Sequence, residues 1–279
     1  MLSWVKVTRG DAPVIVSIPH AGDQLVPEME RRLVSPWLAR KDTDWYIEKL
    51  YDFAPELGVT VVRTPLSRTV IDVNLDPSVK PIHVGQAVAE LCPTTTFDGE
   101  PLYRSGQDPK QAEISRRRAA YFDPYHQVLT AEISRLRAQH EKVVLFDAHS
   151  IRSIIPSLFK GRLPDFNVGT NDGQSCDAAL VAEVEAISDP TGFLRVTNGL
   201  FKGGWTTRHY GNPAAGVHAI EMKLACRSYL HEPDEDHWDS GKQYDRDNWP
   251  PPYDEGRATP IRQALCGILI ACIAFADLP

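Results

Sequence analysis

Two histidines each follow an apolar segment in this sequence, and this arrangement points to metal chemistry. His20 comes just after residues 14–18, and His149 comes three residues after residues 143–146. Both segments have the composition of strands buried on both faces. Because ligands in open α/β folds bind where parallel strands end, we expect the two imidazoles at one edge of a sheet. A metal site is therefore the leading hypothesis.

A catalytic zinc site needs a third protein ligand, which is commonly a carboxylate beside two histidines. Asp23 follows the first histidine by three residues, so one loop could bring both to one ion. Asp42 and Asp44 are the other candidates, and Asp44 is equally well explained as the N-cap of a following helix. Asp147 precedes the second histidine by two residues and would share its face of an extended segment, where it could orient the imidazole.

Several other kinds of site are not supported by the sequence. It contains no GxxxxGK[ST], GxGxxG or GxSxG motif, so phosphate loops and the serine nucleophile of α/β-hydrolases lack a signal. Ser150 beside His149 is a poor nucleophile candidate, because adjacent strand residues point to opposite faces. The net charge of −7 provides no basic surface for nucleic acid. We expect a small-molecule substrate.

Composition predicts a cytoplasmic enzyme with no membrane partner. The chain has 279 residues, of which 42% are hydrophobic and 24% are charged, as in ordinary soluble enzymes. Its five cysteines are scattered and odd in number, which favours reduced thiols. No signal peptide is recognised at the start. The apolar run 264–276 is shorter than the roughly 20 residues of a membrane span, so we expect a buried terminal helix.

Strand and helix patterns alternate along the chain and predict one α/β domain over residues 1–279, with a largely parallel sheet covered on both sides. Strands are expected at 14–18, 59–63, 143–146, 193–197 and 217–224, with an edge strand or extended segment at 65–74. Helices are expected at 27–39, 44–57, 111–140 (with a possible break at Pro124), 178–187 and 259–276. Irregular segments are expected at 76–107, 150–174 and 198–216, and an exposed one at 231–254.

Ten short blocks together resemble the N-formylglutamate amidohydrolase family over residues 13 to 230. They are SIPHAG (17–22), KDTDW (41–45), PLSR (65–68), DVN (72–74), PTTTFDGE (93–100), DAHS (147–150), LPDFN (163–167), GT (169–170), FKGG (201–204) and TRHYG (207–211). The resemblance implies a three-layer α/β/α domain with a mixed sheet, of the phosphorylase/hydrolase-like type found in zinc exopeptidases and aspartoacylase. It also implies hydrolysis of N-formyl-L-glutamate to formate and L-glutamate, a late step of histidine degradation.

The same resemblance implies a ligand set for one divalent ion, expected to be Zn2+. His20 and His149 match the metal histidines of the family. The third ligand falls on Asp42 or Asp44, and we favour Asp44 because the helix that it begins aligns best by its apolar face.

Substrate contacts are implied at four further positions. Arg68 matches a position suited to clamping a substrate carboxylate, since a guanidinium can bind that group through two hydrogen bonds. Asn74 would add a hydrogen bond. Arg208 and His209 belong to a block expected to border the substrate pocket.

Three departures from the family bear on the base and the substrate. Where the family commonly has a glutamate this chain has Lys223, so Glu221, two residues earlier on the same strand face, is our candidate for the base. Leu75 replaces an arginine, and residues 81–84 differ from the usual stretch. Two alternatives therefore stay open: an amidohydrolase for another N-acyl amino acid or carboxylate-bearing amide, and a catalytically silent ligand-binding relative.

Overall fold

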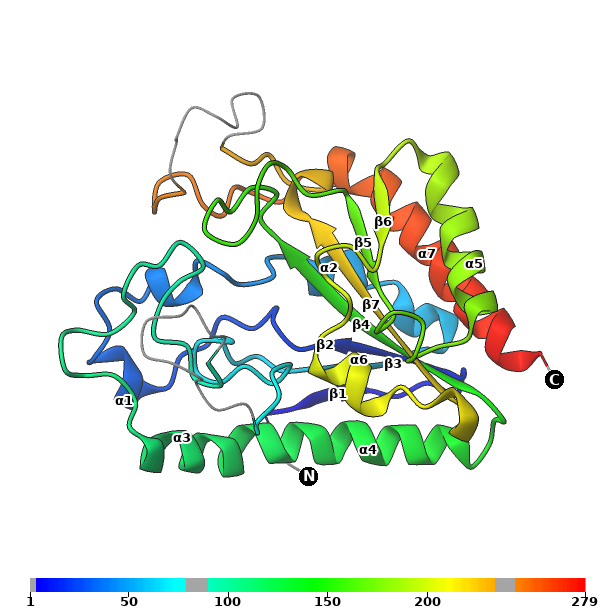
Figure 1. Ribbon diagram of the computed structural model, residues 1–279, viewed down its shortest axis with the longest axis horizontal. Helices are drawn as coiled ribbons and strands as arrows, with labels where there is room; N and C mark the ends of the chain where they lie inside the picture. Colours follow the sequence, from blue (N-terminus) through cyan, green and yellow to red (C-terminus); the bar gives the residue numbers. More distant parts are fainter. Residues whose placement is uncertain (1–3, 79–89, 234–243, 279) are drawn as a thin grey trace.

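The computed structural model describes residues 4–78, 90–233 and 244–278, and its strands form one seven-stranded sheet in the order β1-β3-β2-β4-β7-β5-β6 (Figure 1). The central strands β3, β2, β4 and β7 are parallel, whereas β1 and the pair β5–β6 run in the opposite direction. The predicted mixed, largely parallel sheet is confirmed. The strands are β1 (Lys6–Thr8), β2 (Val14–Ile18), β3 (Thr60–Arg63), β4 (Val143–Ile151), β5 (Phe166–Gly169), β6 (Arg195–Thr197) and β7 (Val217–Ala225).

Helices cover both faces of this sheet, which confirms the three-layer architecture. The α-helices are α1 (Pro27–Glu30), α2 (Ile47–Leu50), α3 (Gln111–Arg117), α4 (Asp123–Arg137), α5 (Ala178–Ser188), α6 (Trp205–Tyr210) and α7 (Glu255–Asp277). Short 3-10 helices occupy Leu38–Arg40, Ala54–Leu57, Asp189–Thr191, Pro213–Ala215 and Cys226–Ser228, and the π-helical segment Arg118–Phe122 joins α3 to α4. In Figure 1, α3, α4 and α6 lie on one side of the sheet, and α5 and α7 on the other.

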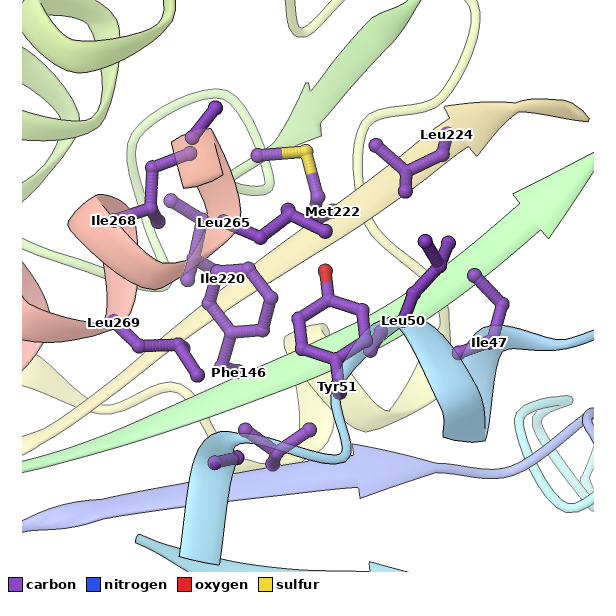
Figure 2. Packing of buried hydrophobic residues seen from close by; sticks show 14 of the residues in the cluster. Ile47, Leu50, Tyr51, Phe146, Ile220, Met222, Leu224, Leu265, Ile268 and Leu269 are labelled. Atoms are coloured by element: carbon purple, nitrogen blue, oxygen red, sulfur yellow. The ribbon is translucent and has the colours of Figure 1, made fainter. Parts of the chain in front are cut away.

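The larger core lies on the α7 side of the sheet. Phe146 of β4 and Ile220 and Met222 of β7 point toward Leu265 of α7, and Tyr51 closes the cluster beside α2 (Figure 2). Since strand side chains alternate, the residues between these on β4 and β7 face the opposite side, beneath α4 and α6. Asp147 and His149 of β4 and Glu221 and Lys223 of β7 lie on that opposite face.

Helix α7 is the one helix in the described part of the chain that is long and apolar enough to cross a membrane. Its inward stripe buries Ile261, Leu265, Ile268 and Leu269 in the core, and it packs along α5 and the sheet. The packing agrees with the buried terminal helix that the sequence predicts.

Two predicted helices are much shorter in the structure. The helix expected over 44–57 is wrong: Tyr46 has a left-handed backbone (φ 60°), α2 spans four residues, and a 3-10 turn containing Pro55 follows. The helix expected over 27–39 is reduced to α1 and one 3-10 turn. In contrast, the helix expected over 111–140 continues through Pro124 and ends at Arg137, because this proline lies in the first turn of α4, which follows the π segment directly.

Four predictions outside the helices also need correction. Strand β4 continues to Ile151, and the segment 150–174 contains β5, while 198–216 contains α6. Residues 65–74 form turns with one isolated bridge, Gln24–Leu66, in place of an edge strand. Within 231–254, the described residues Tyr244 and Trp249 are buried, so that segment is not wholly exposed.

Candidate metal and active site

The α4-side face of the sheet is apolar where its strands begin and polar where they end. Ser17 of β2, Asp147 of β4 and Glu221 of β7 are register neighbours across three parallel strands. One step further along, His149 of β4 is the register neighbour of Lys223 of β7. All except Lys223 are buried. Parallel pairing thus places ionisable groups side by side in two successive rows.

Two imidazoles and one carboxylate meet at the end of these strands. The Nδ1 atom of His149 lies 3.0 Å from Oδ2 of Asp44, and Nδ1 of His20 lies 3.9 Å from the same oxygen. One nitrogen or oxygen atom from each of the three residues lies within 4.8 Å of the others, and all three side chains are buried. Both ring nitrogens therefore converge on one carboxylate oxygen.

Of the three candidate aspartates, Asp44 is the one brought to both histidines. Asp23 is exposed, and Asp42 instead accepts hydrogen bonds from Arg152 and from the backbone of Phe97. The alternative explanation of Asp44 as a helix N-cap is wrong, since α2 begins after Tyr46 without any side-chain cap.

Each histidine is also held through its other ring nitrogen by a second carboxylate. His20 Nε2 lies 2.7 Å from Oδ1 of Asp72, and His149 Nε2 lies 3.0 Å from Oδ2 of Asp147. Such a carboxylate fixes the tautomer with a protonated Nε2 and leaves the Nδ1 lone pair for a metal. Asp147 is placed as the sequence predicts, whereas the partnership of Asp72 with His20 was not foreseen.

Ser17 and Asn74 support the second of these carboxylates. Ser17 Oγ donates to Oδ1 of Asp147 at 2.9 Å, and Tyr125 Oη lies 3.1 Å from the same hydroxyl. Asn74 Nδ2 lies 2.9 Å from Oδ2 of Asp147 and 2.8 Å from Nε2 of His149. Both oxygens of Asp147 are thereby engaged, so the His149 ring has a defined orientation.

The carboxylates around the two histidines favour positive charge in this cluster, as the pKa shifts of its members show. Burial opposes protonation of His149, but Asp147 and Asp44 outweigh it and raise its pKa to about 10. Burial lowers the pKa of His20. Although burial also opposes ionisation of Asp72, His20 and Arg68 hold the pKa of this carboxyl well below its usual range. An anionic cluster that stabilises a proton on His149 would also favour a metal cation in its place.

The donor set fits a divalent metal ion. Ligand atoms in a tetrahedral zinc site are about 3.3 Å apart, because zinc–nitrogen and zinc–oxygen bonds are roughly 2.0–2.1 Å. The distances of 3.0 and 3.9 Å from Asp44 to the two histidines bracket that spacing. Two imidazoles and one carboxylate, with outer carboxylates on both rings, are also the donors that catalytic zinc prefers.

Glu221 stands beside this group and has one oxygen only loosely engaged. Its Oε2 accepts a hydrogen bond from the backbone N–H of Gly204 at 2.8 Å, and its Oε1 lies 3.6 Å from Nζ of Lys223. Asp147, His149 and Glu221 form a second buried group whose potential ligand atoms lie within 4.8 Å of one another. The carboxylate is thus close enough to His149 to act on a molecule bound there.

Arg68 and Asp72, the carboxylate on Nε2 of His20, line a cavity of about 240 Å³. Nη2 of Arg68 is 2.5 Å from Oδ2 of Asp72, and the guanidinium lies 4.7 Å from the centre of the Phe97 ring. The other residues that line the cavity are Asp42, Thr69, Glu90, Pro93, Thr94, Thr95, Thr96, Gly99, Ser157 and Leu158. A cation at the wall of such a cavity can bind an anionic group.

A buried charge network, which the sequence did not reveal, fixes the wall carrying Phe97. Asp98 pairs with Lys41 at 2.7 Å and with Arg152 at 2.9 Å, and both cations are almost fully buried. Arg152 also pairs with Asp42, which accepts from the Phe97 backbone N–H at 2.7 Å. The signal in the sequence was the mixture of charges in the KDTDW (41–45) and PTTTFDGE (93–100) blocks.

Arg208 and His209 are not brought to the cluster. Both are exposed on α6, where Arg208 donates to the carbonyl of Gly203 and His209 stacks on Trp205 with ring centres 4.1 Å apart. Leu75 is partly buried beyond Asn74, and the divergent stretch 81–84 lies outside the described residues.

Comparison with known proteins places this geometry in a family. The sequence model of N-formylglutamate amidohydrolase matches residues 12–230. The chain belongs to the N-formylglutamate amidohydrolase family. It is 47% identical to the N-formylglutamate deformylase of Pseudomonas aeruginosa and 45% identical to that of Pseudomonas putida, in both cases over 225 residues that cover 80% of this chain and 84% of the relative.

Solved structures share its fold. A crystal structure of N-formylglutamate amidohydrolase from Ralstonia eutropha superposes with a TM-score of 0.73 at 22% identity, covering 98% of both chains. A gene product of Agrobacterium tumefaciens has the same TM-score at 16% identity, covering 99% of this chain and 96% of the other. At these identities the similarity establishes the fold alone.

Proposed function

We propose that this protein is a cytoplasmic, metal-dependent amidohydrolase that cleaves N-formyl-L-glutamate to formate and L-glutamate, a late step of histidine degradation. The observation that carries the proposal is the buried convergence of His20, His149 and Asp44 next to Glu221. Membership of the family and the names of relatives 45–47% identical support the substrate. The reaction needs only water and a small-molecule substrate, with no nucleic acid or membrane partner.

His20, His149 and Asp44 would hold one Zn2+ ion. When bound, such an ion supplies Lewis-acid chemistry, which polarises an amide carbonyl and makes a water molecule more acidic. Asp72 and Asp147 keep the two rings oriented, because each accepts from the nitrogen that faces away from the converging group. The contribution of the chain is therefore a preoriented set of donors in a buried site.

Glu221 is proposed as the general base and acid. The Gly204 N–H holds Oε2 in place, and Oε1 is left to take a proton from water. As the water oxygen bonds to the formyl carbon and the C–N bond breaks, Glu221 delivers this proton to the amide nitrogen, so that a neutral amine and formic acid form, and the proton of formic acid then passes to the amine to give formate and the ammonium form of glutamate. A proton transfer of this kind contributes roughly 10²- to 10⁴-fold to the rate.

Arg68 is proposed to bind the side-chain carboxylate of the substrate in the adjoining cavity. The guanidinium already pairs with Asp72 on one side and has the Phe97 ring over it. The cavity of about 240 Å³ has room for the short methylene chain of glutamate. Asn74 Nδ2 donates to Oδ2 of Asp147, so we assign Asn74 to orienting this carboxylate and not to direct substrate contact. The exposed Arg208 and His209 are left out of the proposed substrate site.

The decisive experiment is metal analysis of the purified protein coupled to an assay of formate release from N-formyl-L-glutamate. We expect about one zinc per chain and turnover that disappears on chelation and returns with added zinc. Formate release that is insensitive to thorough metal removal would contradict the metal-dependent mechanism.

A second candidate function is hydrolysis of another N-acyl amino acid. It is favoured by Lys223, which introduces a cation next to the proposed base. A panel of N-formyl, N-acetyl and N-carbamoyl amino acids separates the two, since a formylglutamate enzyme should prefer its own substrate by a large factor in kcat/KM. A zinc-loaded protein that binds such compounds saturably without turnover would instead be a silent relative.

A further inference from the structure

The Lys223 ammonium lies beside the converging residues, and its one acidic neighbour among the described residues is 3.6 Å away. Its register neighbour on β4 is His149, so its side chain emerges in the same row as one of the converging imidazoles. Its Nζ atom lies 4.4 Å from the centre of the Phe201 ring, and its side chain is 16% exposed. The ammonium therefore lies over the Phe201 ring, beside the converging residues, and does not extend into solvent.

The N–H donors of this ammonium also lack acceptors among the described residues. Its acidic neighbour is Glu221, whose Oε1 lies 3.6 Å away, beyond normal hydrogen-bond length. Among the described residues no side chain or carbonyl accepts a hydrogen bond from Nζ, although an ammonium carries three N–H donors. A largely buried cation without close acceptors is unfavourable by itself, and an anionic ligand would satisfy it.

The position of Glu221 indicates which anion this would be. A residue that protonates the amide nitrogen must lie near that nitrogen, and the α-carboxylate carbon of an N-acyl amino acid is two covalent bonds away from it. Since Lys223 is the cation next to Glu221, whereas Arg68 pairs with Asp72, the carboxylate on Nε2 of His20, the two cations would bind different groups.

We propose that Lys223 is a specificity-determining residue that binds the α-carboxylate of the substrate, with Arg68 binding the side-chain carboxylate. This inference rests on the proposed amidohydrolase function and extends it. The substrate class is thereby defined as N-acyl amino acids with a free α-carboxylate, and the dicarboxylate is favoured because its two charges meet two separate cations.

The test compares N-formyl-L-glutamate with its α-carboxamide in the wild-type protein and in Lys223→Met. A lost charge-assisted hydrogen bond is expected to cost about 10- to 100-fold. The wild type should prefer the free acid by about this factor in kcat/KM, and Lys223→Met should lose most of the preference because its kcat/KM falls far more on the free acid than on the carboxamide. Lys223→Arg should keep part of it.

A matched control is Lys202→Met, which removes an exposed lysine that pairs with Asp172 at 2.9 Å. It should leave the preference intact. Equal losses on both substrates in Lys223→Met, or no preference in the wild type, would overturn the proposal.

If the wild type hydrolyses neither compound, the proposed function fails and binding decides the role of Lys223. Calorimetric titration with the same two compounds should then show tighter binding of the free acid, and Lys223→Met should abolish that difference. Equal binding of the acid and the carboxamide by the wild type would reject the inference independently of turnover.

Discussion

Strands β4 and β7 are neighbours of nine residues each, and they carry their polar residues in the same two rows, yet they hold these residues differently. On β4, Asp147 is bound through both oxygens and both nitrogens of His149 face a carboxylate. On β7, Glu221 has one hydrogen bond, from a backbone N–H, and Lys223 has none among the described residues. The polar residues of β4 thus have all their partners within the protein, whereas those of β7 keep hydrogen-bond donors and acceptors for a ligand.

This difference indicates a division of labour between adjacent strands. A residue that holds an ion must keep its geometry within a few tenths of an ångström, and multiple hydrogen bonds provide that rigidity. A residue that exchanges protons or binds substrate must keep lone pairs or N–H groups for the ligand. Changes on β4 should therefore affect ion binding, whereas changes on β7 should affect turnover and selectivity.

The largest effect is expected from breaking β4 at His149. A His149→Ala protein should lose stoichiometric zinc and, with it, measurable formate release, because two ligands remain where three are needed. Elemental analysis and the formate assay check this outcome. His140→Ala, which alters a histidine in the turn after α4, is the control and should keep both properties. One zinc per chain in the His149→Ala protein would refute the ligand assignment.

A change on β7 should separate chemistry from ion binding. Glu221→Gln keeps the shape of the side chain and removes its basicity, so zinc content should persist while kcat falls about 10²- to 10⁴-fold. Steady-state kinetics on metal-analysed protein provides the measurement, and Glu56→Gln at an exposed position should behave as wild type. Undiminished turnover would remove Glu221 from the role of base.

A smaller effect should follow when the outer partner of a ligand is weakened. Asp72→Asn leaves His20 in place but replaces its anionic acceptor, for which a loss of about 10- to 100-fold in zinc affinity is expected. Competition with a chromophoric chelator measures that affinity, and thermal unfolding shows that the protein is still folded. An unchanged affinity would mean that Asp72 does not support His20 as a ligand and serves only its other partners, Arg68 and the backbone N–H of Asn74.

The smallest effect on the site is expected from a histidine outside both strands. His126 of α4 is buried, with Nε2 2.7 Å from the Val73 carbonyl oxygen, and burial lowers its pKa to about 4. Below about pH 6.5 the unfolded chain binds a proton that the folded protein does not, so stability falls as pH decreases toward 4. This group should cost about 2 kcal/mol between pH 7 and pH 5.

Urea unfolding of wild type and His126→Gln at those two pH values measures this contribution. The variant should lose correspondingly less stability on acidification. Identical losses in the two proteins would show that His126 does not carry the pH dependence.

Much of the sheet could be predicted because its strands carry local signals. Residues 14–18 and 143–146 are short apolar runs, and these are the patterns that buried parallel strands require. The end of β4 was missed because Asp147 and His149 look like the start of a loop. They remain in the strand because the face beneath α4 is itself polar there, with Ser17 and Glu221 as lateral neighbours.

The candidate site was predictable in its strand-borne parts and not in its loop-borne parts. His20 and His149 could be selected by their positions after strands, but the sequence left three aspartates open. The choice among them depends on the left-handed backbone of Tyr46, which makes α2 begin at Ile47 and leaves Asp44 outside the helix. The pairing of Asp72 with His20 spans 52 residues and has no local signature.

Gly204 lies where the loop before α6 passes directly over Asn74. A Cβ atom at this position would be 2.4 Å from Nδ2 of Asn74, the amide nitrogen that touches both Asp147 and His149. One added methyl group would therefore displace the amide and disturb β4, while the same loop also positions Glu221 through the Gly204 N–H. The absence of a side chain at Gly204 leaves room for the Asn74 amide beside β4 and for the N–H that holds Glu221 of β7, so a substitution here should disturb both strands.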